Sequence, residues 1–120
     1  MGAVLSLTAY AALAENWVNY AIGNNGTEYS YDRNSLKAQG RTYYVWVMQI
    51  YSRERKKREH STKIRYFLDC DNQAITTLTI VDYEQDGSVI NNVTYKPYQQ
   101  VTEPIIPGSV GTGLHDTVCG

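Results

Sequence analysis

The sequence predicts an α+β fold of mainly antiparallel strands followed by one C-terminal helix. Two observations support this class: strand-like segments rich in Tyr, Val, Ile and Thr are joined by short turns that contain glycine, and the last segment changes to helical spacing. The 11 Tyr residues, against one Phe, favour strands with half-exposed faces. The predicted strands span residues 16–23, 27–32, 41–52, 62–70, 74–83 and 88–95.

The first two strands are predicted to form a hairpin. Segment 16–23 (NWVNYAIG) and segment 27–32 (TEYSYD) are joined by Asn-Asn-Gly, which accepts the positive φ that a tight turn requires. Asp32 and Ser35 are then suited to cap a short helical turn over residues 33–40, which ends in glycine.

The next two strands differ in their apolar pattern. Segment 41–52 (RTYYVWVMQIYS) is almost continuously apolar and aromatic, which predicts a central strand covered on both faces. Segment 62–70 (TKIRYFLDC) alternates instead, so that Lys63 and Arg65 share one face and Cys70 lies on the other, with the aliphatic residues. Cys70 is therefore expected to point into the core.

The second half of the fold continues with another hairpin and ends in a helix. Segments 74–83 and 88–95 flank Glu-Gln-Asp-Gly, a type I turn followed by glycine. Segment 96–108 holds three prolines, which exclude a regular strand or helix and predict a crossing loop. Ser109 is the expected N-cap of a helix over residues 109–119. Two glycines cost this helix about 1 kcal/mol each relative to alanine, so it needs support from the sheet.

Residues 1–14 have the features of a secretory signal peptide. The segment is uncharged, holds an apolar stretch and ends in the small-x-small sequence Ala-Leu-Ala. The alternative is a short N-terminal helix packed on the domain. Residues 15–120 have the length of one globular domain and are expected to form a single unit. No apolar run approaches the roughly 18 residues of a membrane-spanning helix, so no transmembrane segment is expected.

Two cysteines, Cys70 and Cys119, lie 49 positions apart (119 minus 70). In an exported chain an even count favours a disulfide, and closing a loop of this length removes about 4 kcal/mol of unfolded-state entropy. Such a bridge would pin the weak C-terminal helix to the sheet. Two alternatives remain: free thiols in a reducing compartment, and a zinc site shared with His60 and His115, whose spacings match no structural zinc pattern.

Segment 53–60 (RERKKREH) is the strongest local charge feature. It holds five of the 11 basic residues, and without it 6 basic and 10 acidic residues leave a balance of −4. Such a density of cations suits phosphate, sulfate or an acidic protein surface, and the alternative is a charged hairpin tip that prevents aggregation. No motif for specific nucleic-acid recognition accompanies it. The five basic residues are Arg53, Arg55, Lys56, Lys57 and Arg58.

An aromatic stripe runs along segment 41–52. It is either buried core or a stacking platform for a planar ligand such as haem or a sugar. For haem, the axial ligand would come from His60 or His115, although an exposed histidine without a role is the simpler expectation. The aromatic residues of the stripe are Tyr43, Tyr44, Trp46 and Tyr51.

Catalytic motifs are missing from the sequence. It has no GxSxG, no HExxH and no phosphate-binding glycine loop. Asp69 and Asp71 flank Cys70, and their negative charges oppose formation of a reactive thiolate. We therefore expect neither enzymatic activity nor a cofactor.

Five segments carry a family resemblance: YSYDRNSL, YYVWVMQIYS, IRYFLDCDNQ, TLTIVDYEQDGSVI and IIPGSVGTGLHDTVC. In this order they resemble segments of the surface-adhesin protein E family of bacterial exported proteins, over most of residues 16–119. The resemblance implies a six-stranded antiparallel sheet with a C-terminal helix fastened by a Cys70–Cys119 disulfide. It also implies a periplasmic or cell-surface location. Adhesion to host matrix and serum proteins, and haem binding, are activities attributed to the family's named member and are not carried over to this chain.

Together these features predict an exported, non-enzymatic binding domain of the bacterial cell envelope. It would present the basic hairpin loop and a Tyr-rich sheet to a host protein, an envelope protein or a polyanion. The alternatives are a structural accessory protein of the periplasm without its own ligand, and a binder of a small planar ligand. The sequence predicts neither the identity of the ligand nor the oligomeric state.

Overall fold

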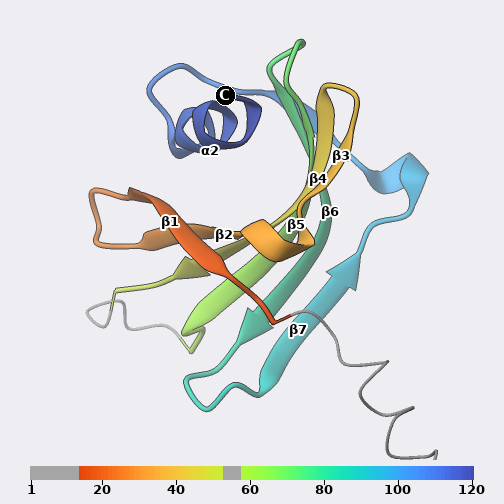
Figure 1. Cartoon of the computed structure of the whole chain (residues 1–120). Coiled ribbons are helices and arrows are strands. Elements are labelled where there is room, and N and C mark those ends of the chain that lie inside the picture. Colours follow the sequence, from red (N-terminus) through yellow and green to blue (C-terminus); the bar gives the residue numbers. More distant parts are fainter. Residues whose placement is uncertain (1–13, 53–57) are drawn as a thin grey trace, which may run out of the picture.

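One antiparallel sheet of eight strands is the main feature of residues 14–52 and 58–120, the part of the chain that the computed structural model describes (Figure 1). The strands are β1 (Trp17–Ile22), β2 (Glu28–Asp32), β3 (Lys37–Gln39), β4 (Thr42–Ile50), β5 (Ser61–Asp69), β6 (Ala74–Tyr83), β7 (Val89–Thr94) and β8 (Thr102–Pro104). The other elements are the 3-10 turns η1 (Arg33–Ser35) and η2 (Pro97–Gln99) and the helix α2 (Val110–Cys119).

Six strands follow the order β1-β2-β4-β5-β6-β7, while β3 pairs with β4 and β8 pairs with β6. These six are the strands that the sequence predicts, and the C-terminal helix is present where it is expected. The α+β class, with its mainly antiparallel sheet, is therefore confirmed. The two additional strands, β3 and β8, have three residues each.

The sheet bends around α2, which lies on its concave side (Figure 1). Strands β4 and β5 form the centre, with nine residue pairs that run without interruption from Thr42↔Asp69 to Ile50↔Ser61. Register shifts interrupt the pairing of β1 with β2, of β5 with β6, and of β6 with β7. Such bulges increase the local twist and so contribute to the bend. We call the side toward α2 the inner face and the opposite side the outer face.

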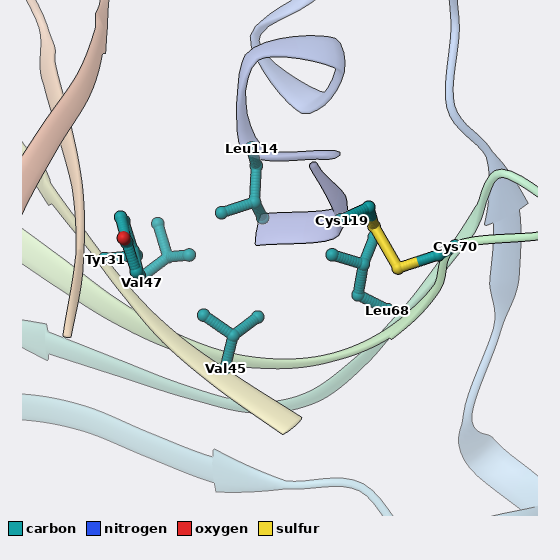
Figure 2. Packing of buried hydrophobic residues seen from close by; sticks show 7 residues of the cluster. All are labelled: Tyr31, Val45, Val47, Leu68, Cys70, Leu114 and Cys119. Atoms are coloured by element: carbon teal, nitrogen blue, oxygen red, sulfur yellow. A yellow bond between two sulfur atoms is a disulfide. The ribbon is translucent and has the colours of Figure 1, made fainter. Parts of the chain in front are cut away.

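The hydrophobic core lies between α2 and the inner face. Leu114 of α2 points toward Val45 and Val47 of β4, with Leu68 of β5 beside them (Figure 2). All four side chains have at most 1% of their surface exposed. The alternation of the sequence produces this packing, because every second residue of β4 and β5 faces the helix. Burying such aliphatic side chains contributes about 1.5–3 kcal/mol each.

A disulfide joins Cys70, just after β5, to Cys119 at the end of α2 (Figure 2). The two Cα atoms are 5.8 Å apart, within the ordinary range for this bond. The expected bridge is therefore present, and it attaches the helix to the sheet. Two further contacts surround it: His115 donates from Nε2 to the Cys70 carbonyl oxygen at 3.0 Å, and Arg41 donates to the Cys119 carbonyl oxygen at 3.5 Å.

The prediction that segment 96–108 is a crossing loop without a regular strand or helix is wrong. Residues Pro97–Gln99 form η2, and Thr102–Pro104 form β8, which pairs with β6. The Oγ1 atoms of Thr76 and Thr102 lie 2.6 Å apart across this pairing. Proline is compatible with this strand because β8 lies at an edge of the sheet, where one side of the backbone needs no partner for an N–H group.

The helical turn predicted over 33–40 is correct only for its first half. Asp32 is the N-cap of η1, and its Oδ1 accepts from the Asn34 N–H at 3.2 Å. Residues Lys37–Gln39 are the short strand β3 instead, and Gly40, with a φ of +61°, makes the tight turn into β4. Pairing with β4 satisfies the backbone of these residues and so replaces the second half of the helical turn.

The prediction that segment 41–52 is covered on both faces is also wrong. Within β4 only Val45 and Val47 are buried, and both belong to the inner face. Tyr44 and Trp46 lie on the outer face and remain half-buried. Their rings pack sideways against neighbours on β5 rather than beneath a second layer; Tyr44, for example, lies 5.1 Å from the ring of Phe67. The continuous apolar run of this segment therefore forms a strand that is covered by a second layer on one face only.

Candidate binding surface

The outer face carries a mixture of aromatic and basic side chains. The pairing of β4 with β5 places Tyr44 opposite Phe67 and Trp46 opposite Arg65, all on this side of the sheet. Strands β1 and β6 add further rings. We call this group the aromatic–basic surface. Its members are Trp17, Tyr44, Trp46, Lys63, Arg65, Phe67 and Tyr83.

Lys63 lies between two aromatic rings on this surface. Its Nζ is 5.5 Å from the ring centroid of Trp17 and 5.3 Å from that of Tyr83. The same Nζ lies 3.5 Å from Oε1 of Glu15, and the indole N–H of Trp17 donates to the other oxygen of Glu15 at 2.8 Å. The negative faces of the two rings and the carboxylate together favour the charged ammonium at this position.

Arg65 is held in a different way. The carbon at the centre of its guanidinium group lies 5.0 Å from the ring centroid of Tyr44. Among the residues that the structure describes, no carboxylate lies within ion-pair distance of Arg65. A guanidinium stacked on a ring keeps its N–H donors at the edge of that ring, so Arg65 has donors available for an anionic partner.

Two hollows lie on the outer face. The first has a volume of about 360 Å³ and is bordered by Trp17, Trp46, Lys63 and Tyr83 together with Asp32. The second has a volume of about 580 Å³, and threonine, tyrosine and glutamine side chains make up much of its lining. Its border includes Tyr44, Arg65, Thr79, Thr94, Tyr95 and Gln100.

Asp32 is charged in the first hollow despite its burial. Burial opposes the charge, but the backbone N–H groups of Asn16, at 2.8 Å, and Asn34, at 3.2 Å, both donate to Oδ1. The hydroxyl of Ser35 and the positive charge of Lys63 act in the same direction, so the pKa of Asp32 is lowered below its ordinary value. The hollow thus contains a fixed carboxylate that is ionised at neutral pH.

The structure does not bring the predicted tyrosine platform together. Tyr43 lies on the inner face, where it packs against the core, whereas Tyr44 lies on the outer face. The hydroxyl of Tyr51 lies 2.7 Å from Oγ1 of Thr62, which in turn donates to Asp82 at 2.7 Å. Of the predicted stripe, Tyr44 and Trp46 are the two that share the outer face.

The basic loop is described only at its end. Arg53, Arg55, Lys56 and Lys57 lie outside the described residues. Arg58 forms an exposed ion pair with Glu84, with 2.5 Å between Nε and Oε1. Arg58 thus joins the described end of the β4–β5 connection to the turn between β6 and β7.

The histidines occupy different environments. The backbone of His60 extends the sheet ladder, accepting from the N–H of Tyr51 at 3.0 Å and donating to the carbonyl of Tyr83 at 2.8 Å. His115, expected to be exposed, has only 18% of its side chain accessible, because it bonds to the Cys70 carbonyl. The disulfide also removes both thiolates that the alternative zinc site requires. Within the described residues no group of three or more histidine, cysteine or acidic side chains is placed to hold a metal ion.

Some residues of the aromatic–basic surface could be found from the sequence and others could not. Strict alternation in segment 62–70 already places Lys63, Arg65 and Phe67 on one face. No comparable sequence pattern indicates that Trp17 and Tyr83 belong to this surface. Tyr83 reaches Lys63 from the neighbouring strand β6, whereas Trp17 reaches it from β1, which does not pair with β5.

Comparisons with known proteins give two findings and one negative result. The model of the surface-adhesin protein E family matches residues 17–120. No curated protein sequence matches the chain. Solved structures share the fold. Separately, the part of the chain that the structure describes contains no helix that is long and apolar enough to cross a membrane.

Similar solved structures include those of protein E from Haemophilus influenzae. One has a TM-score of 0.63 at 14% identity, and the match covers 90% of this chain and 86% of that one. A second crystal form gives 0.62 at 14% identity and covers 90% of each chain. A structure of protein E from non-typeable Haemophilus influenzae gives 0.57 at 15% identity and covers 91% of this chain and 78% of that one. At this identity the structures establish the fold, and the family model establishes the kinship: the chain belongs to the surface-adhesin protein E family.

Proposed function

We propose that this chain is an exported, non-enzymatic adhesin domain that binds a protein or polyanionic partner through its β4–β5 hairpin. Family membership supports a role in surface adhesion. The distribution of charge is the observation that favours this hairpin as the binding region. Seven of the 11 basic residues lie on this hairpin, five between 53 and 58 and two on β5, Lys63 and Arg65.

This distribution makes the chain electrically asymmetric. Residues 42–69 contain seven basic and three acidic residues, a balance of +4, whereas the rest of the chain contains four basic and nine acidic residues, a balance of −5. A charge separation of this kind steers an acidic partner toward one end of the molecule. Lys63 and Arg65 extend the positive charge from the loop onto the outer face.

The proposed location is the periplasm or the cell surface. A disulfide between Cys70 and Cys119 persists in an oxidising compartment and is uncommon in the cytosol. In this proposal residues 1–14 are the signal peptide, which lies almost entirely outside the described residues, and residues 15–120 are the functional domain.

Chromatography on heparin tests the proposal. We expect the native protein to be retained at low salt, and replacement of all five basic residues between 53 and 58 by serine to abolish retention. The salt dependence of binding should flatten as cations are removed, because each neutralised anion releases counterions. The melting temperature should stay unchanged, since the one described ion pair of this segment, between Arg58 and Glu84, is exposed.

A matched control replaces basic residues elsewhere. Lys37→Ser and Lys96→Ser remove two exposed cations outside the hairpin and should leave retention on heparin intact. Absence of retention by the native protein would instead favour a structural accessory role without a polyanionic ligand.

A further inference from the structure

Both tryptophans of the chain border the first hollow on the outer face. Tyr83 adds a third aromatic ring to the same border, and the volume of about 360 Å³ lies at the lower end of the range for small-ligand sites. Three charged side chains stand among the rings: Asp32, Glu15 and Lys63. The combination of flat aromatic surfaces with charged acceptors and donors restricts the chemistry of a ligand.

An organic cation does not suit this hollow. Aromatic cages bind such cations between their rings, but the position between Trp17 and Tyr83 is already taken by the ammonium of Lys63, at 5.5 and 5.3 Å. A ligand cation would have to displace this ammonium from both rings and from Glu15.

Anions and purely apolar ligands fit no better. Two carboxylates, Asp32 and Glu15, oppose an anion, while a single ammonium attracts it, and that ammonium already faces Glu15 at 3.5 Å. A purely apolar ligand would remove charged groups from water without replacing their hydrogen bonds, which costs free energy.

We propose that this hollow binds one or two units of an uncharged saccharide. The C–H face of a sugar ring packs on the flat side of an aromatic ring, and the hydroxyls at its edge both donate and accept hydrogen bonds. Asp32 and Glu15 supply acceptors. Within the described residues, the indole N–H of Trp46 and the hydroxyl of Tyr83 have no hydrogen-bond partner, so both are available as donors to a sugar oxygen.

This inference does not depend on the proposed polyanion binding. None of the basic residues between 53 and 58 is among the described residues that border the hollow, and its proposed ligand is neutral, whereas the ligand proposed for the basic loop is anionic. A chain that fails to bind heparin could still bind a neutral sugar, and the reverse also holds.

Tryptophan signals provide a direct test, because the chain has only two tryptophans and both report on this hollow. The probes are three neutral disaccharides, lactose, maltose and diacetylchitobiose, added to millimolar concentrations. We expect at least one of them to shift the tryptophan emission and the two indole N–H signals in ¹H–¹⁵N NMR spectra, with a dissociation constant in the millimolar range. This readout uses the native protein, so it does not depend on whether a variant folds.

Variants then locate the contact. Trp46→Ala should weaken the binding at least about tenfold, as is typical for an aromatic anchor. Tyr83→Phe keeps the ring and removes one donor, so it should weaken the binding by a smaller factor. The control Tyr98→Phe, at an exposed residue outside the hollow, should change nothing. Circular dichroism verifies that each variant is folded.

Three results would overturn the inference. The first is the absence of a shift with all three disaccharides. The second is a shift produced by tetramethylammonium chloride or sodium sulfate but by none of the sugars, which would assign the hollow to an ion. The third is unchanged sugar affinity in folded Trp46→Ala.

Discussion

The inner and outer faces of the sheet are built from alternate residues of the same strands, yet they differ in almost every physical property. On β4, Val45 and Val47 have no exposed surface beneath α2, whereas Tyr44 and Trp46 remain half-buried on the other side. The inner face combines aliphatic side chains with tyrosines and is closed by a helix and a disulfide. The outer face combines rings with cations and contains two hollows. The inner face therefore holds most of the buried core, whereas the outer face carries charged groups among its rings.

The disulfide provides the largest expected effect. Replacing both Cys70 and Cys119 by alanine should lower the free energy of unfolding by about 4 kcal/mol, because the unfolded chain regains the entropy of a large loop. Urea denaturation of the variant and of the native protein, with and without a reducing agent, measures this difference. A loss below about 1 kcal/mol would show that α2 stays on the inner face without its covalent link.

A matched pair of truncations sharpens the comparison of the two faces. Leu114→Ala removes a side chain that is 1% exposed and should cost about 3 kcal/mol. Met48→Ala removes a side chain of similar size that is half-buried on the outer face, and it should cost about 1 kcal/mol. Chemical denaturation of the native protein and of both variants measures these losses of stability. Equal costs would contradict the view that the inner face carries most of the stability.

Acid titration gives the smallest of the three effects. The pKa of Asp32 is lowered in the folded state from its ordinary value of 3.8, so its contribution is fully present above that value and is lost as the pH falls through the lower, folded-state pKa. The substitution Asp32→Asn keeps a capping oxygen but removes the negative charge that the N–H groups of Asn16 and Asn34 stabilise, so it should cost about 1 kcal/mol at neutral pH and should flatten the decrease of stability in acid.

The control for this titration is Glu28→Gln, at an exposed position on β2, which should preserve the acid dependence of the native protein. An identical acid profile in Asp32→Asn would mean that other carboxylates dominate. Candidates for such a result are Asp69, Glu84 and Asp86, whose pKa values are also lowered by hydrogen bonds with their neighbours.

Elements with a strong local pattern could be predicted from the sequence. The alternation of segment 62–70 assigns Cys70 to the core and Lys63 to the opposite face, and both assignments hold in the structure. The helix over 109–119 follows from its N-cap and apolar spacing, although two glycines weaken it. In each case the information lies within a few residues of the element itself.

Features that depend on distant pairing could not be predicted. Strands β3 and β8 are three residues long and exist only because β4 and β6 offer free edges to them. The first hollow likewise depends on tertiary structure: Trp17, Trp46 and Tyr83 come from three different strands, and no local pattern indicates that they share one border. Tyr43 and Tyr44 are adjacent in the chain and point to opposite faces, because successive side chains of a strand alternate between its two sides.

The position of α2 at the end of the fold has a consequence for how the chain folds. In the described part of the chain, the helix follows every strand of the sheet that it covers. During export from the N-terminus, the concave aliphatic surface therefore stays exposed until the final segment arrives, a situation of high contact order in which slow folding and chaperone binding are expected. Formation of the sulfur–sulfur bond should be the last step of maturation, and a chaperone that binds this intermediate should recognise the surface around Val45 and Leu68.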